Sequence, residues 1–179
     1  MKYVIKIEAM GQFPEIQIVK DQFESICRAR ENLSNGLAME EKYEILISNY
    51  LDFEKELICN AANSMVRRPS DYEEFFQVRM DFNIRLVNLL TATRLYKDSL
   101  HRHVRAIIPG FKGIKDEILN LFTQEFEHNP EYRFVDELRD YVQHRGVPVH
   151  WTQHHSYRDE SEKEHKIIFS VELASEKNI

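Results

Sequence analysis

The fold is decided by residues 71–105, which read DYEEFFQVRMDFNIRLVNLLTATRLYKDSLHRHVR. No glycine or proline interrupts this stretch. Its apolar residues recur three and four positions apart, which is the spacing of one helical face; they are Phe75, Val78, Phe82, Leu86, Leu89, Leu90 and Tyr96. Residues 70–73 have the form of a capping box, and Pro109 and Gly110 mark the end. The sequence therefore predicts one long helix here.

The residues before this helix predict two further helices with a loop between them. A short helix is expected over Asp21–Glu31, and a longer one from Met39 to about Arg67, where the apolar residues again recur with helical spacing. Four small polar or glycine residues separate the two, and they are typical of a loop: Asn32, Ser34, Asn35 and Gly36.

Two more helices are expected after Gly110. One fits Ile114–Phe126, and the other begins at Asn129-Pro130, with the proline in its first turn. Gly146 and Pro148 stop this last helix after His144.

Both ends of the chain carry strand signals. Residues 2–9 alternate between apolar and polar, and residues 16–19 continue as a second extended segment. Near the C-terminus, Val147–Trp151 and Lys166–Leu173 look like strands, with polar residues 152–165 as their link. The expected fold class is mainly α: an antiparallel multi-helix bundle over about residues 38–146, with a small β-sheet formed by N- and C-terminal strands, all in one domain.

Composition indicates a soluble protein. The chain is 42% apolar and 30% charged, with no run long enough to cross a bilayer and no segment like a signal peptide. Cys27 and Cys59 are too few for a disulfide framework, and we expect them to be buried thiols in a reducing compartment. A cytoplasmic location and no membrane partner follow as expectations.

Basic residues gather in one stretch of this acidic chain. The formal net charge is -6, yet residues 94–115 hold six Lys or Arg against Asp98 alone. Such a stripe is typical of nucleic-acid binding, and it is equally typical of a solvated helix face. Its candidate substrate-binding residues are Arg94, His101, Arg102 and Arg105.

Several motifs of common enzymes are missing. The sequence has no phosphate-binding glycine loop, no Cys-x-x-Cys and no His-Glu-x-x-His. The His101-x-His103 and His154-His155 pairs lack the third ligand or the i, i+4 spacing of a metal site. We therefore expect no metal and no cofactor.

The motif that best suits chemistry is Arg139-Asp140-Tyr141-Val142-Gln143-His144. It lies in the last turns of the final predicted helix. Three other Arg/His pairs have similar spacing: Arg94–His101, Arg145–His150 and Arg158–His165. The second spans a glycine and a proline, and the third lies in the expected polar link. Arg94–His101 lies in a helix but has Leu95 after the arginine, so it ranks second.

In these residues the sequence resembles the HEPN superfamily of helical-bundle ribonucleases, whose motif is an Arg, commonly followed by Asn, Asp or His, and then a His after four to six intervening residues. The resemblance covers the bundle at about residues 38–146, and Arg139, Asp140 and His144 match the motif itself. It implies a metal-independent endoribonuclease that acts on RNA, with one composite site where two copies meet in a homodimer. It also implies a setting in toxin or antiviral defence systems, with an antitoxin-like protein partner.

The residue types suit RNA cleavage without a metal. A histidine near neutral pKa can move the proton of a 2′-hydroxyl, and an arginine can hold the charged phosphate. Asp140 lies four residues before His144, where it could orient the imidazole. Arg139 and His144 lie about 140° apart on an ideal helix, and an unwound last turn would bring them closer.

Two other functions fit the same sequence. The bundle could be a non-catalytic protein-interaction module, using its terminal strands for edge pairing. It could also bind RNA through residues 94–115 without cutting it. In both cases Arg139 would pair with a nearby acid and His144 would favour the helix C-terminus.

Overall fold

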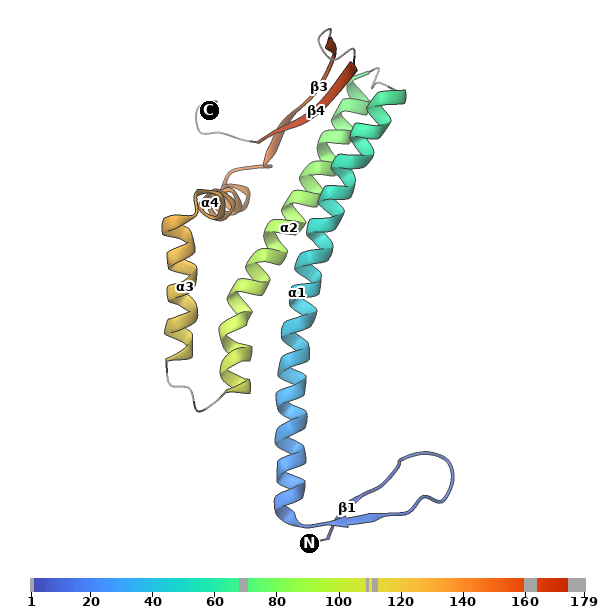
Figure 1. The fold of residues 1–179 in the computed structure, drawn as a ribbon, viewed down its shortest axis with the longest axis vertical. Coiled ribbons are helices and arrows are strands. Elements are labelled where there is room, and N and C mark those ends of the chain that lie inside the picture. The colour runs from blue at the N-terminus through green and yellow to red at the C-terminus, as the bar shows by residue number, and fades with distance from the viewer. Residues whose placement is uncertain (1, 68–70, 109, 111–112, 160–163, 174–179) are drawn as a thin grey trace.

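The computed structural model describes residues 2–67, 71–108, 110, 113–159 and 164–173. Within these residues the chain forms four helices and two separate two-stranded sheets (Figure 1). The mainly helical class that the sequence predicts is confirmed. Among the described residues, no helix is both long and apolar enough to span a membrane.

Two long helices form the frame of the molecule. The helix α1 (Lys20–Val66) and the helix α2 (Tyr72–Ile107) run antiparallel, side by side. Asp71 caps α2, because its carboxylate accepts a hydrogen bond from the Glu74 N–H at 2.9 Å. The predicted capping residue Ser70 lies outside the described residues.

The predicted loop at residues 32–36 is wrong, because α1 continues through it without a break. The side chain of Asn35 bonds back to the Glu31 carbonyl at 3.0 Å, so this polar residue is satisfied inside the helix. Gly36 has ordinary helical backbone and open space where a Cβ would lie. Strong helix formers on both sides outweigh the local preference of these residues.

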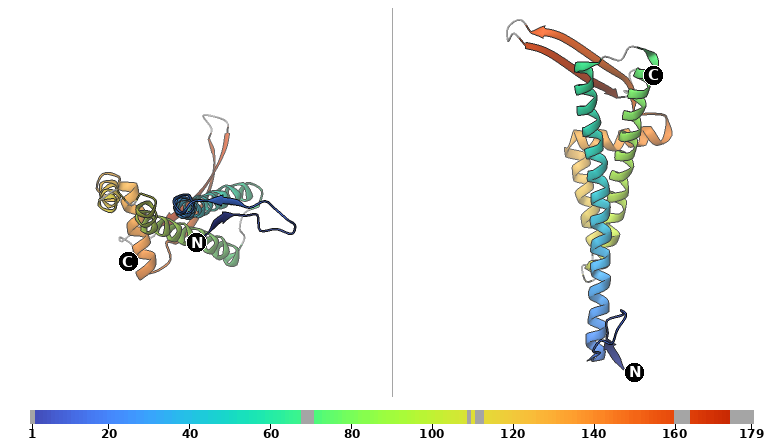
Figure 2. Two further views of the ribbon diagram at one scale, coloured as in Figure 1. Left: turned by 90° about the horizontal axis from the view of Figure 1, so that it is seen from below. Right: turned by 90° about the vertical axis from the view of Figure 1, so that its right-hand side faces the viewer.

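Two shorter helices pack beside the frame. The helix α3 (Ile114–His128) lies alongside α2. The helix α4 (Pro130–His144) crosses α2 at a steep angle (Figure 2). Asn129 caps α4 by accepting from the Tyr132 N–H at 3.0 Å, directly before the proline. Both helices begin where the sequence predicts.

The terminal strands form two hairpins at opposite ends of the frame. The strands β1 (Tyr3–Ile5) and β2 (Ile16–Ile18) pair with each other, as do β3 (Val149–Asp159) and β4 (Glu164–Leu173). The terminal strands are confirmed, but they make two sheets, and residues 152–159 are strand where a link was expected. Residues 152–159 are mostly polar, so they show no apolar alternation that would reveal a strand.

The core lies where α2, α4 and β3 meet, and its buried members are Phe82, Leu86, Leu90, Leu138 and Val149. Phe82 is fully buried, and its ring contacts Phe53 of α1 and Phe169 of β4, at centroid distances of 6.0 Å and 5.4 Å. Away from this core much of α1 faces solvent. For that reason Cys27 and Cys59 are exposed, contrary to the expectation of buried thiols.

Candidate functional site

A groove between α2 and α4 brings together the arginines of the two best Arg/His motifs. Arg94 of α2 and Arg139 of α4 both line it, and its volume is about 460 Å³. Its floor and walls also include Leu90, Thr91, Val142 and Gln143. The two arginines belong to separate motifs in the sequence, so the groove is a product of the fold.

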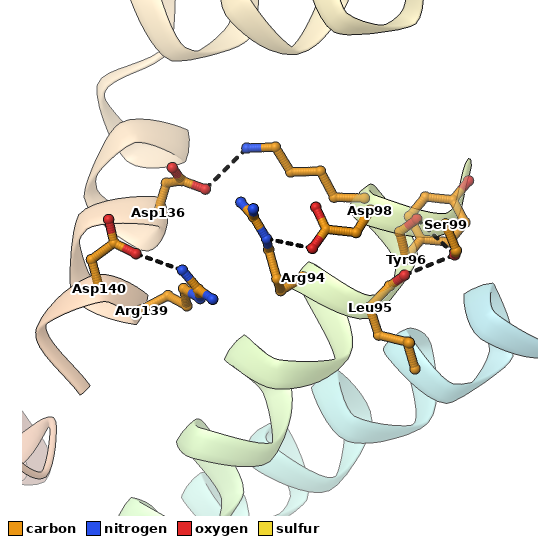
Figure 3. Close-up of polar contacts among 9 residues, drawn as sticks. Arg94, Leu95, Tyr96, Asp98, Ser99, Asp136, Arg139 and Asp140 are labelled. Atoms are coloured by element: carbon orange, nitrogen blue, oxygen red, sulfur yellow. Dashed lines mark hydrogen bonds and ion pairs between the residues drawn. The ribbon is translucent and has the colours of Figure 1, made fainter. Parts of the chain in front are cut away.

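Both arginines of this groove have an acidic partner (Figure 3). Arg94 Nε lies 2.7 Å from Asp98, and Arg139 Nη1 lies 2.6 Å from Asp140. A third pair, Lys97 with Asp136 at 3.0 Å, joins α2 to α4. Each of the three pairs holds one charge of either sign, so together these six residues carry no net charge.

Lys97 is the best-anchored of these cations. Its ammonium lies over the rings of Phe122 and Tyr132, at 5.5 Å and 5.1 Å from their centroids. Burial lowers the pKa of Lys97, but the contacts with Tyr132 and Asp136 outweigh it, so that the pKa is raised above its ordinary value. Lys97 therefore stays charged and fixes α4 against α2.

His144 does not share this groove. The helix α4 is regular to His144, and the Arg145 N–H still donates to the Tyr141 carbonyl at 2.8 Å. The last turn is therefore not unwound, and Arg139 and His144 remain about 140° apart. His144 is exposed.

Asp140 contacts the arginine of the motif. Its carboxylate accepts from Arg139, and among the described residues no hydrogen bond joins it to His144. Asp140 thus positions Arg139, and its expected contact with the imidazole does not form.

The remaining predicted substrate-binding residues lie further along α2. Arg94, His101 and Arg105 share one side of the helix by spacing, but Arg105 is about 16 Å from Arg94 along the axis. Arg102 and Arg105 are exposed and His101 is half-buried. Arg94 therefore lines the groove together with Arg139, whereas His101, Arg102 and Arg105 lie outside it.

A second cavity, which the sequence analysis missed, lies between the start of α2 and β3. Its volume is about 260 Å³, and its lining is Tyr72, Phe75, Phe76, Arg79, His150, Trp151 and Thr152. Three aromatic residues within five positions at the start of α2 were the signal for it. We call it the aromatic cavity.

The aromatic cavity adjoins the motif on α4. His150 lines the cavity, and its Nε2 lies 3.4 Å from the Tyr141 hydroxyl, within the motif. Arg79 lies over the Phe76 ring at 5.3 Å and donates to the His150 carbonyl at 3.4 Å. Trp151 is 61% exposed, so its ring is open to a ligand.

No metal site is found in the part of the chain that the structure describes, where no three His, Cys, Asp or Glu residues gather. His103, of the His101-x-His103 pair, is engaged elsewhere: the Lys42 ammonium donates to its Nε2 at 3.0 Å. The side chains of His154, Arg158 and His165 lie outside the described residues.

Comparisons with protein-family models, with curated proteins and with solved structures find no significant match to this chain.

Proposed function

We propose that the chain is a metal-independent endoribonuclease whose phosphate-binding groove lies between α2 and α4. The observation that supports this most is the meeting of Arg94 and Arg139 in one groove. Two guanidinium groups that face one space can hold two oxygens of one phosphate. Each arginine has five N–H donors, so the contacts with Asp98 and Asp140 leave others for a ligand.

The reaction is an internal transesterification. The 2′-hydroxyl of RNA attacks the neighbouring phosphorus, a base removes its proton, and the bond to the 5′-oxygen breaks as that oxygen takes up a proton. The products are a 2′,3′-cyclic phosphate and a 5′-hydroxyl. His144 is the proton-transfer residue in this proposal, and the arginines stabilise the charge that builds on the phosphate oxygens.

The proposal needs a second copy of the chain. His144 lies outside the groove that Arg139 lines, and α4 shows no distortion that would bring it in. One chain therefore offers the phosphate site and the histidine on different faces of one helix. A homodimer in which α4 meets α4 would place the His144 of one copy beside the Arg139 of the other. A toxin or defence setting, with an antitoxin-like partner, remains an implication of the HEPN resemblance.

The experiment compares variants in RNA cleavage with EDTA present. We expect His144→Ala and Arg139→Ala to lose about 100-fold to 10,000-fold of the parent rate. His128→Ala and Arg133→Ala are matched controls, since His128 ends α3 as His144 ends α4, and Arg133 is exposed on α4. If His144→Ala cuts RNA as fast as the parent, the proposal is wrong.

A second candidate function is a non-catalytic interaction module. The charge balance of Arg94, Lys97 and Arg139 with their acidic partners favours it, because paired surface charges need no substrate. Under this alternative the parent does not cut RNA. If the parent instead binds RNA uncut, with a steep dependence on salt that survives His144→Ala, the chain is an RNA-binding protein.

A further inference from the structure

The first part of α1 stands apart from the rest of the molecule. Figures 1 and 2 show α1 continuing well past the end of α2, with no other helix beside it. Lys42 contacts His103 near the end of α2, which marks where the paired part of α1 begins. We call residues 19–37, the N-cap and first five turns of α1, the arm.

The arm carries an exposed apolar stripe. Five large apolar side chains on it are between 42% and 75% exposed: Val19, Phe23, Ile26, Leu33 and Leu37. Together with Arg30 they follow one another at alternating distances of four and three residues, which is the seam of a coiled coil. A groove of about 410 Å³ runs along this stripe, lined by Ile26, Ala29, Arg30, Leu33, Ser34 and Leu37.

The stripe points away from α2. The half-buried residues of α1 that face α2, such as Lys42, Phe53 and Leu57, lie roughly opposite the stripe by helical spacing. Beyond Leu37 the seam positions become acidic, with Glu40 and Glu44. These two glutamates interrupt the apolar seam at the end of the arm, and the stripe is separate from the packing of α1 on α2.

We propose that the arm pairs with the arm of a second copy of this chain, in antiparallel orientation. With the twofold axis near Arg28, Val19 of one copy lies against Leu37 of the other, and Phe23 lies against Leu33. Ile26 lies against Arg30, whose aliphatic stem covers it while the guanidinium reaches water. All the seam positions then find a seam position of the other copy.

Charge decides the orientation. A parallel pair in register would place Arg30 against a second Arg30, two like charges at the centre of the seam. The antiparallel pair separates them. Four of the flanking positions are small, namely Cys27, Ala29, Ser34 and Gly36, and they let the two helices approach closely.

The surface is large enough for a specific contact. With roughly 100 Å² exposed on each of the five apolar side chains, two copies offer on the order of 1,000 Å², about the area that a specific interface needs. At the start of the arm Tyr3 of the β1–β2 hairpin packs on Phe23 at 4.9 Å, and the hairpin also exposes Ile5, Ile7 and Ile16.

This contact is independent of the proposed ribonuclease. The groove at Arg94 lies near the level of Tyr43, whose ring contacts Tyr96, roughly 20 Å along α1 from Arg28. Paired arms would thus hold the two grooves roughly 45 Å apart, too far to build a composite site. Loss of the arm contact and loss of catalysis can therefore be told apart.

The first test measures molar mass by light scattering across a range of protein concentrations. We expect Leu33→Asp to halve the mass of the parent assembly while the helix content measured by circular dichroism stays the same. Ile58→Asp is the matched control, since Ile58 is 66% exposed on α1 outside the arm, and it should leave the mass unchanged. A monomeric parent, or a Leu33→Asp variant of parental mass, would overturn the proposal.

The second test reports orientation and does not depend on the stability of any single variant. In a Cys59→Ser background a short bismaleimide should join Cys27 to Cys27 of the second copy, because both lie on the same flank near the axis. With Cys27 also replaced by Ser, Lys20→Cys should crosslink to Ser34→Cys when the two proteins are mixed, and neither should crosslink to itself. Self-crosslinking of each, without the mixed product, would refute the antiparallel pair.

Discussion

The side-chain amide of Asn83 holds the backbone of Val149 by two hydrogen bonds. The Val149 N–H donates to Asn83 Oδ1 at 2.8 Å, and Asn83 Nδ2 donates to the Val149 carbonyl at 3.0 Å. Both residues are buried. The pair fastens the start of β3 to the first third of α2, and so it helps to fix the end of α4, which four residues separate from β3.

Replacement of Asn83 by Ala should lower the free energy of unfolding by about 2–4 kcal/mol, because it leaves a buried N–H and a buried carbonyl without partners. Urea denaturation followed by circular dichroism measures the change. Asn60→Ala is the control, since within the described part of the chain the Asn60 amide bonds only to Glu56, one turn away. A loss no greater than that of the control would show that water replaces Asn83.

Replacement of Gly36 by Ala should raise the free energy of unfolding by about 0.5–1 kcal/mol, because alanine favours a helix interior. Nothing lies within 4 Å of the Cβ that it adds. Gly113→Ala should have the opposite effect, because Gly113 has a φ of 104°. If Gly36→Ala destabilises the chain, α1 is interrupted there, as the sequence alone suggests.

The sequence predicts the helices best where proline and glycine mark their ends. Pro109 with Gly110, Asn129 with Pro130, and Gly146 set the bounds of α2, α3 and α4 to within two residues. Polar residues at 32–36 of α1 and at 152–159 of β3 led to the wrong prediction of a loop and a link, because such residues locally favour turns. The residues at the helix ends therefore predict where most helices begin and end. They do not predict that α1 continues through residues 32–36 or that β3 continues through residues 152–159.

The sequence could predict only those residues of the candidate site that lie together on one helix. Arg139, Asp140 and His144 are close in sequence, so their placement on α4 was predictable. Arg94 and Arg139 meet because of the angle at which α4 crosses α2. This crossing angle cannot be derived from the spacing of residues along the chain. The same holds for Asn83 and Val149, which are far apart in the sequence.

Lowering the pH should destabilise the chain through His103. Burial lowers the pKa of His103, and the charges of Lys42 and Arg102 lower it further. The unfolded chain, with a histidine pKa near 6.5, then binds the proton more tightly than the folded chain. This contribution to stability is present above that pKa and is lost as the pH falls below it.

Lys42→Met tests the effect, because it removes the charge and keeps the stem. We expect the pKa of His103, followed by NMR, to rise in this variant. The fall in the free energy of unfolding between about pH 7 and about pH 5 should become shallower. Lys55→Met is the control on the same helix, where Lys55 pairs with Asp52. An unchanged His103 titration would mean that the charge of Lys42 does not affect the pKa of the imidazole.

RNA should quench the fluorescence of Trp151 if the chain acts on RNA as proposed. Trp151 is the single tryptophan of the chain and lines the aromatic cavity, so the emission reports on that cavity alone. Unpaired bases stack on aromatic rings, and each such contact contributes about 1–3 kcal/mol to binding. His144→Ala serves as the protein in this titration, so that the oligonucleotide is not cut.

We expect Phe76→Ala to weaken the binding of a single-stranded oligoribonucleotide by roughly 10-fold to 100-fold, which corresponds to the loss of one stacked base. Phe134→Ala is the control, since Phe134 is 46% exposed on α4 and does not line the cavity. An abasic oligonucleotide of the same length separates stacking from charge, because it keeps the phosphates and lacks the rings. If it quenches Trp151 as strongly as the parent oligonucleotide, the bases do not enter the cavity and the contact is with the phosphate backbone through Arg79.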